Sequence, residues 1–160
     1  MIIIIIINKF QVLIMLSDLK SRYENYIQSQ HLKTSKRRDI IFNYISTTRG
    51  HFTADNIYQN IMKVDAGIGI ATVYRTIRLL VDCDVLIEHT FGEKKGYFEV
   101  NDINSRHHDH LICTSCGNII EFQCDLIEDD KQRIAKQYKF EINSHKLEIF
   151  GLCSKCQQKK

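Results

Sequence analysis

The 160-residue chain contains no proline and only seven glycines. Average composition would give about 8 Pro and about 11 Gly in a chain of this length. The absence of proline excludes collagen-like and proline-rich classes, cis-proline turns and stiff proline linkers. Element boundaries must therefore be read from Gly, Asn, Asp and Ser and from the spacing of apolar residues. Charged residues make up 26% and apolar residues 44% of the chain, which is typical of a folded globular protein.

Signature motifs of several enzyme classes are also missing. The chain has no HExxH, no GxxxxGK[ST], no GxSxG and no GxGxxG motif, which would mark zinc proteases, phosphate loops, hydrolases and dinucleotide enzymes. The zinc-deaminase pattern fails because it needs both HxE and a proline. We therefore expect no enzymatic activity and no small-molecule substrate.

The first 14 residues, with six consecutive isoleucines, precede Met15, where a conventional chain could start. This apolar run is shorter than the roughly 20 residues of a membrane span, and it lacks the pattern of a secretory signal. Consecutive β-branched residues favour a strand. We expect residues 1–14 to be an extension without function, and the protein to be cytoplasmic and not membrane-bound. In a reducing compartment, the six cysteines are metal ligands or buried thiols rather than disulfides.

Apolar periodicity predicts four helices and then a β-hairpin in residues 15–100. The expected helices run from Ser17 to about Ser29, from Ser35 to Arg49-Gly50, onward from Thr53, and over residues 71–82; the expected strands are 85–91 and 96–100. This order is typical of a winged helix, in which the fourth helix enters the DNA major groove and the hairpin is the wing. An unrelated small α+β unit would give the same pattern.

A second, smaller segment is expected after a polar hinge at residues 101–106. It covers residues 107–156 and leaves a frayed tail at 157–160. The sequence predicts two short strands around a CxxC turn, a helix over about 126–138, and an extended stretch over 139–152. The whole chain is thus predicted to be of the α+β class.

Two CxxC motifs carry the strongest chemical signal, and they are formed by Cys113, Cys116, Cys153 and Cys156. Two such turns supply four thiolates to a tetrahedral Zn²⁺ in a closed, structural site. A strand, a helix and a second strand fit between the two motifs, so the ion would link the beginning of the second segment to its end. The alternative of two redox motifs lacks a thioredoxin-like context. Cys83 is expected to be a small buried residue, and Cys124 has no assignment.

The run His107-His108-Asp109-His110 is a second group of potential ligands. If it enters a strand, His108 and His110 lie on one face, and His107 and Asp109 on the other. One tetrapeptide could then supply two metal sites on opposite faces. Further imidazole and carboxylate ligands near element ends are His51, Glu99, Glu121, Glu128 and His145. This donor set suits Fe²⁺, Mn²⁺, Co²⁺ or Zn²⁺; the alternative is a polar surface turn.

Basic and aromatic residues in the first segment point to an anionic partner. Residues 31–49 have a net charge of +4 in a chain of net charge +3. On the predicted fourth helix, Thr72, Tyr74 and Arg75 can bond phosphates and base edges. A solvated helix face would have the same composition.

Together these features resemble the ferric uptake regulator family over about residues 17–156. The motifs that carry the resemblance are GIATVYRTIRLL at 69–80, HHDHLICTSCG at 107–117, IIEF at 119–122 and CSKC at 153–156. It implies a homodimeric repressor of iron uptake and homeostasis, with pairing of dimers into a tetramer left open, that binds a pseudo-palindromic DNA operator when Fe²⁺ is bound. A winged-helix DNA-binding domain would precede a small α/β dimerisation domain.

The resemblance also implies a role for each candidate residue. The structural zinc ligands would be Cys113, Cys116, Cys153 and Cys156. The regulatory ion, Fe²⁺ or in its place Mn²⁺, Co²⁺ or Zn²⁺, would be held by His51, Glu99, His108, His110 and Glu121. A further site would comprise His107, Asp109, Glu128 and His145. Tyr74 and Arg75 would read the major groove, and Lys33 would reach into the minor groove.

The sequence leaves open which signal the protein senses and whether it binds DNA at all. Peroxide-sensing relatives are expected to carry Asp where this chain has Glu121, which favours iron. A zinc- or peroxide-sensing regulator of the same family is one alternative. A zinc-linked metal buffer or interaction module that binds no DNA is another. The chain also departs from the family pattern at Lys36-Arg37-Arg38, where many members have Pro-Gln-Arg.

Overall fold

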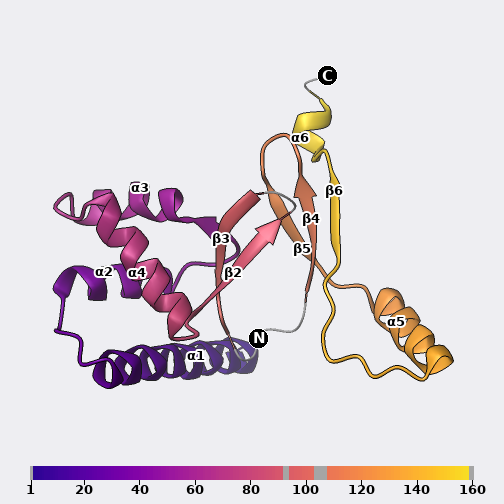
Figure 1. The fold of residues 1–160 in the computed structure, drawn as a ribbon, viewed down its shortest axis with the longest axis horizontal. Helices are drawn as coiled ribbons and strands as arrows, with labels where there is room; N and C mark the ends of the chain where they lie inside the picture. The colour runs from indigo at the N-terminus through magenta and orange to yellow at the C-terminus, as the bar shows by residue number, and fades with distance from the viewer. Residues whose placement is uncertain (1, 92–93, 103–107, 159–160) are drawn as a thin grey trace. The chain divides into compact units, whose positions relative to one another are not determined.

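The structure, a computed structural model, describes residues 2–91, 94–102 and 108–158, and for residues 2–9, 94 and 95 it describes the backbone alone. Contacts divide the chain into two compact units, Met1–Ser105 and Arg106–Lys160 (Figure 1). Most of the predicted hinge falls outside the described residues. None of the helices that the structure describes is both long enough and apolar enough to cross a membrane.

The first unit has the element order of a winged helix. Its elements are α1 (Ile2–Ser29), α2 (Lys36–Ile45), β1 (Phe52–Thr53), α3 (Ala54–Val64), α4 (Ile70–Asp82), β2 (Leu86–Phe91) and β3 (Lys94–Val100). The three strands form one antiparallel sheet in the order β1-β3-β2. The predicted hairpin is confirmed, whereas the two-residue strand β1 was not foreseen.

Helix α1 begins much earlier than predicted. A strand over the isoleucines and a helix start at Ser17 are both wrong, because α1 already begins at Ile2. Met15 and Leu19 are buried in the core, so packing requires helix before Ser17. Continuing a helix upstream lets each residue satisfy its backbone within the helix, while each Ile lowers helix propensity by only a few tenths of a kcal/mol.

Helix α2 starts as predicted and ends early. The Ser35 side chain accepts a hydrogen bond from the Arg38 N–H and caps the first turn. The helix ends at Ile45 rather than at Arg49-Gly50. Hydroxyls of Thr47 and Thr48 donate to the Tyr44 carbonyl and compete with further helical turns.

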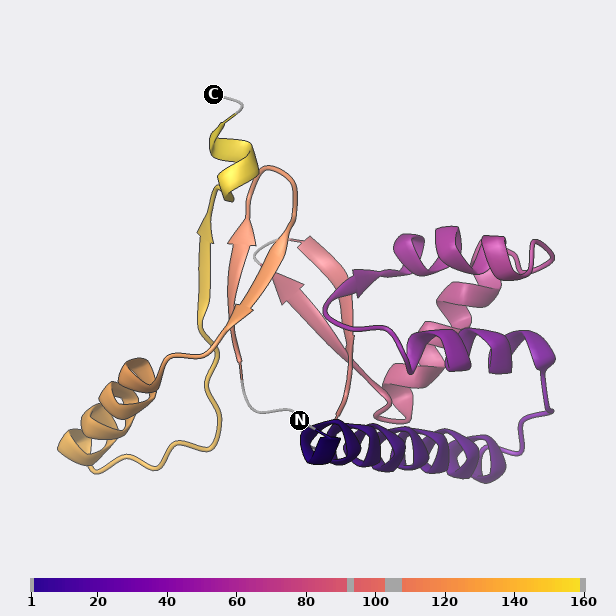
Figure 2. The ribbon, with the colours of Figure 1, turned by 180° about the vertical axis from the view of Figure 1, so that it is seen from behind.

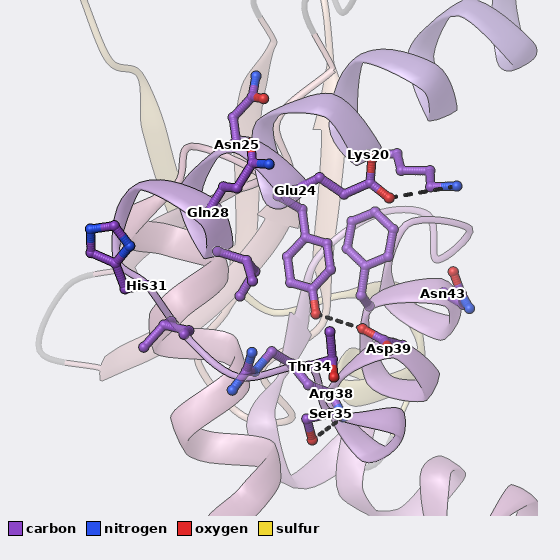
Figure 3. A pocket seen from close by; sticks show the side chains of 14 residues that line it. Lys20, Glu24, Asn25, Gln28, His31, Thr34, Ser35, Arg38, Asp39 and Asn43 are labelled. Carbon is purple, nitrogen blue, oxygen red and sulfur yellow. Dashed lines mark hydrogen bonds and ion pairs between the residues drawn. The ribbon is translucent and has the colours of Figure 1, made fainter.

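Side chains that line a groove between α1 and α2 connect these two helices (Figure 3). Tyr23 stacks on Phe42 with ring centroids 4.5 Å apart, and its hydroxyl donates to Asp39 at 2.8 Å. Burial and this hydrogen bond raise the pKa of Tyr23. Arg38 donates to the Lys33 carbonyl at 3.2 Å, which ties the connecting loop to α2.

The core of the first unit is apolar and continuous. Thr53 and Asn56 form a reciprocal capping box at the start of α3. Four residues of α4 are predicted to face inward: Val73, Ile77 and Leu80 are buried, whereas Val81 is only half-buried and packs against the edge of the core. Helix α4 packs on both α2 and α3, and this leaves its opposite face exposed.

The second unit is a small sheet with one long helix (Figure 2). Its elements are β4 (Asp109–Cys113), β5 (Ile119–Phe122), α5 (Asp125–Tyr138), β6 (Glu148–Gly151) and α6 (Ser154–Gln157). Strand β4 is central, antiparallel to β5 and parallel to β6. The predicted extended stretch over 139–152 is too long, because pairing with β4 begins only at Glu148.

Candidate metal centres

The four motif cysteines meet at one point of the second unit. Cys113 ends β4, and Cys116 lies in the turn that follows. Cys153 is the N-cap of α6, and Cys156 lies within that helix. The four sulfur atoms all lie within 4.8 Å of one another. The Cys116 and Cys153 sulfurs are 3.7 Å apart, close to the roughly 3.8 Å that two thiolates have at about 2.3 Å from a tetrahedral zinc.

Backbone amides prepare this cluster for a cation. The Cys153 N–H donates to the Cys113 sulfur at 3.3 Å. Backbone N–H groups of Cys153 and Cys116 lower the pKa of the Cys113 thiol to about 6. The Ser115 side chain lowers the pKa of Cys156, but the sulfurs of Cys116 and Cys153 outweigh it and raise the value to about 11. Sulfurs this close cannot all ionise without a counter-charge, and a divalent cation supplies one.

Strand pairing in the first unit brings His51 against Glu99. Phe52 pairs with Phe98 in antiparallel register. His51, which precedes Phe52, therefore lies opposite Glu99, which follows Phe98. The His51 Nε2 and Glu99 Oε2 atoms are 2.9 Å apart, and both side chains are largely buried. The short strand β1 therefore explains how two residues so distant in sequence become neighbours.

His89 is a third member of this group and was not predicted from the sequence. Its Nε2 lies 3.3 Å from the other oxygen of Glu99, and its ring is 5.0 Å from that of His51. Burial raises the pKa of Glu99, but hydrogen bonds from His51 and His89 outweigh it and hold the pKa well below its ordinary value. Phe91 stacks on His89 and meets His51 edge-on, which walls this group on one side.

In the second unit, the predicted alternation along β4 is present. The rings of His108 and His110 are neighbours, with centroids 4.9 Å apart. His110 is buried and pairs directly with Glu121 on β5. Side chains of such a pair lie on the same face of the sheet.

Asp109 turns toward other partners. Its Oδ1 lies 4.0 Å from His145 Nε2, which is 3.6 Å from Glu128 Oε1. Asp109 is buried. Of the four residues predicted for the further site, His145 thus lies near both Asp109 and Glu128, while His107 lies outside the described residues.

The predicted DNA-contacting residues are accessible on the first unit. Tyr74 and Arg75 are exposed on α4, and Thr72 is half-buried. The Tyr74 hydroxyl donates to Asp55 at 3.2 Å, which raises its pKa. Lys33 is exposed in the loop between α1 and α2.

The two remaining cysteines differ in environment. Cys83 is buried, as predicted, and its thiol contacts the Leu80 carbonyl at 3.6 Å. Burial raises the pKa of the Cys83 thiol. Cys124 is half-buried at the N-cap of α5, and nothing assigns it a role.

Known proteins of similar sequence and structure are metal-responsive regulators. The sequence profile of the ferric uptake regulator family matches residues 29–150. The ferric uptake regulation protein of Campylobacter jejuni is 33% identical over 144 residues, which cover 89% of this chain and 90% of that protein. The peroxide-responsive repressor PerR of Staphylococcus aureus is 31% identical over 128 residues, covering 80% and 84%.

A solved structure supports the same relationship. The ferric uptake regulator Fur of Helicobacter pylori, described as having three functional metal binding sites, superimposes with a TM-score of 0.77 at 28% identity. The match covers 89% of this chain and 93% of that one. The predicted α+β class, with a winged-helix part followed by a small α/β part, is confirmed. The chain therefore belongs to the ferric uptake regulator family, whose members are metal-responsive transcription regulators rather than enzymes.

Proposed function

We propose that this protein is a cytoplasmic, Fe²⁺-dependent repressor that binds a pseudo-palindromic DNA operator as a homodimer and controls iron uptake. The observation that carries the proposal is the buried His51–Glu99 pair at the end of the wing strand β3. Glu99 lies close to the chain segment that leads into the second unit. An ion held there is well placed to control the DNA-binding unit.

The regulatory ion would take ligands from both units. His51 and Glu99 would come from the first, and His108, His110 and Glu121 from the second. Imidazole and carboxylate donors suit Fe²⁺, and Mn²⁺, Co²⁺ or Zn²⁺ could take its place. Such an ion would restrict the freedom of the two units and favour the arrangement that fits two operator half-sites. By linkage, bound DNA would tighten metal binding by the same factor.

His89 would act through Glu99. It lies against one carboxylate oxygen while His51 lies against the other. When the metal binds Glu99, a hydrogen bond from His89 would fix the orientation of the carboxylate, as outer partners of metal ligands commonly do. His89 is thus a positioning residue in this proposal.

The second unit would carry the structural zinc and the dimer interface. Four thiolates from Cys113, Cys116, Cys153 and Cys156 make a closed site without an open position for substrate. Large apolar side chains lie exposed on and after α5, with Leu126 77%, Tyr138 72% and Phe140 70% accessible. Exposed apolar surface of this kind is typical of an interface, and a second copy of the chain is its proposed partner.

Replacing Arg75 with alanine is expected to weaken operator binding by about 10- to 100-fold, the effect of losing one bidentate base contact. Binding of the Mn²⁺-loaded protein to a pseudo-palindromic duplex, selected from a random pool by the wild-type protein, measures this by fluorescence anisotropy. Arg133→Ala is the matched control, because Arg133 is an exposed helix arginine on α5 of the second unit. Equal affinities for Arg75→Ala and wild type would point to the module without DNA binding.

A peroxide-sensing role is the second candidate, since the Staphylococcus aureus repressor PerR is nearly as similar to this chain as the Campylobacter regulator. Glu121 favours iron sensing, because peroxide-sensing relatives are expected to carry Asp at this position. Exposure of the Fe²⁺-loaded protein to peroxide separates the two. Persistent operator binding supports the iron-responsive repressor, and selective loss through histidine oxidation supports the peroxide sensor.

A further inference from the structure

The face of β4 opposite His110 carries a group of charged side chains with an unexpected member. Asp109 on β4, Glu128 on α5 and His145 before β6 approach one another through the distances given above. Lys131 stands one helical turn after Glu128 on the same face of α5. Its ammonium lies 2.5 Å from Glu128 Oε1 and is also in contact with His145 Nε2.

The lysine is held within the group rather than extended into solvent. Its side chain is only 21% exposed, which is low for a lysine on a surface helix. An ammonium has three donors and no acceptor, so it can donate at once to a carboxylate oxygen and to an unprotonated imidazole nitrogen. Both atoms, Glu128 Oε1 and His145 Nε2, belong to residues predicted to be ligands of the further site.

A divalent ion and this ammonium cannot share the position. A metal bound to Glu128 and His145 would lie about 2.0–2.2 Å from each ligand atom. The Lys131 ammonium contacts the same two atoms, so the cations would be close enough to repel strongly in a half-buried site. The side chains in this arrangement therefore do not fit a metal ion unless the Lys131 ammonium moves away from Glu128 and His145.

We propose that the Lys131 ammonium is the resident cation of this site and takes the place of a divalent ion. The lysine bridges α5 to the segment that precedes β6, as a metal would, but the bridge does not depend on metal supply. The chain would then respond to metal through its regulatory site alone, with zinc as a fixed structural element. That consequence rests on the proposed function, whereas the occupancy of this site does not.

Counting bound ions tests the proposal directly. The full-length protein, with its zinc retained, is dialysed against buffered Co²⁺, and the ions bound per chain are measured by elemental analysis and by Co²⁺ absorption. Lys131→Gln should bind about one more Co²⁺ per chain than wild type, with affinity at this site raised at least about 10-fold. Lys136→Gln, an exposed lysine on the same helix, should bind the wild-type number.

Two further variants locate the effect and guard against misfolding. In Lys131→Gln, the additional Co²⁺ should disappear when His145 is also replaced by alanine. In the wild-type background, His145→Ala should leave the number of bound ions unchanged, because no ion is there to lose. Loss of one Co²⁺ from this single variant, or equal binding by wild type and Lys131→Gln, would overturn the proposal.

The same titration separates this inference from the proposed function. Glu99→Gln should remove the regulatory Co²⁺ in either background. If Glu99→Gln binds as many Co²⁺ ions as the protein without this change, the proposed sensing site is wrong. The number of Co²⁺ ions bound by Lys131→Gln still tests the role of Lys131.

Discussion

Replacing Cys116 with serine is expected to abolish binding of the proposed structural zinc ion and to unfold the second unit. A neutral hydroxyl is a poor ligand for Zn²⁺ compared with a thiolate, and structural zinc contributes about 10–16 kcal/mol to the folding of small zinc domains. The second unit spans residues 106–160, and below about 70 residues a single core rarely suffices without such a link. Among the residues described in this unit, the buried hydrophobic side chains are Ile112, Cys113 and Ala135, of which Ile112 alone is large.

Three measurements follow this loss. Elemental analysis should fall from about one tightly held zinc per chain to nearly none, the thermal unfolding midpoint should drop, and sedimentation should show loss of the dimer. Cys124→Ser is the matched control, because that cysteine lies outside both motifs. Full zinc content and an unchanged unfolding midpoint in Cys116→Ser would contradict the four-thiolate site.

Replacing Glu99 with glutamine is expected to uncouple operator binding from metal. The carboxylate lies between two imidazoles and keeps its charge because they lower its pKa. A neutral amide of the same shape removes one anionic ligand. The free Mn²⁺ concentration needed for half-maximal DNA binding should therefore rise at least about 100-fold. Removing only the hydrogen-bond partner of a metal ligand commonly lowers metal affinity by about 10- to 100-fold, so loss of the ligand itself should cost no less. Fluorescence anisotropy with buffered Mn²⁺ measures the midpoint.

Two companion variants grade this effect. Glu88→Gln makes the same change on β2, where the carboxylate pairs with Arg78, and should leave the Mn²⁺ midpoint unaltered. His89→Gln should shift the midpoint by about 10- to 100-fold, as expected for a positioning residue. A midpoint for Glu99→Gln that equals wild type would remove Glu99 from the regulatory site.

Local chemistry made much of the fold predictable. The cap at Ser35, the capping residue Thr53 and three of the four inward residues predicted for α4 depend on neighbours within a few positions, and the structure has them. The CxxC pairs were also predictable from the sequence, because two cysteines three residues apart can bind the same metal ion.

Features that depend on distant contacts were missed. The early start of α1 reflects the packing of Met15 and Leu19 on the core. The two-residue strand β1 has no periodicity to detect, yet it sets His51 opposite Glu99. His89 joins them only through the register of the hairpin, in which Ile87 pairs with Glu99 and places His89 diagonally across.

Lys131 shows a different limit of sequence reasoning. The spacing of Glu128 and Lys131 predicts an ordinary surface pair on a helix. Only the folded chain adds His145, from the segment before β6, to that pair. The ligand types were visible in the sequence, but the competing cation was not.

The central claim is that one regulatory ion and one operator favour the same state of the protein. Its most direct test measures the operator affinity of the wild-type protein with and without saturating Mn²⁺, and the Mn²⁺ affinity with and without the operator. Linkage predicts that Mn²⁺ strengthens DNA binding about 5- to 150-fold and that DNA strengthens Mn²⁺ binding by the same factor. Operator binding that is tight and equal at all Mn²⁺ concentrations would contradict the account.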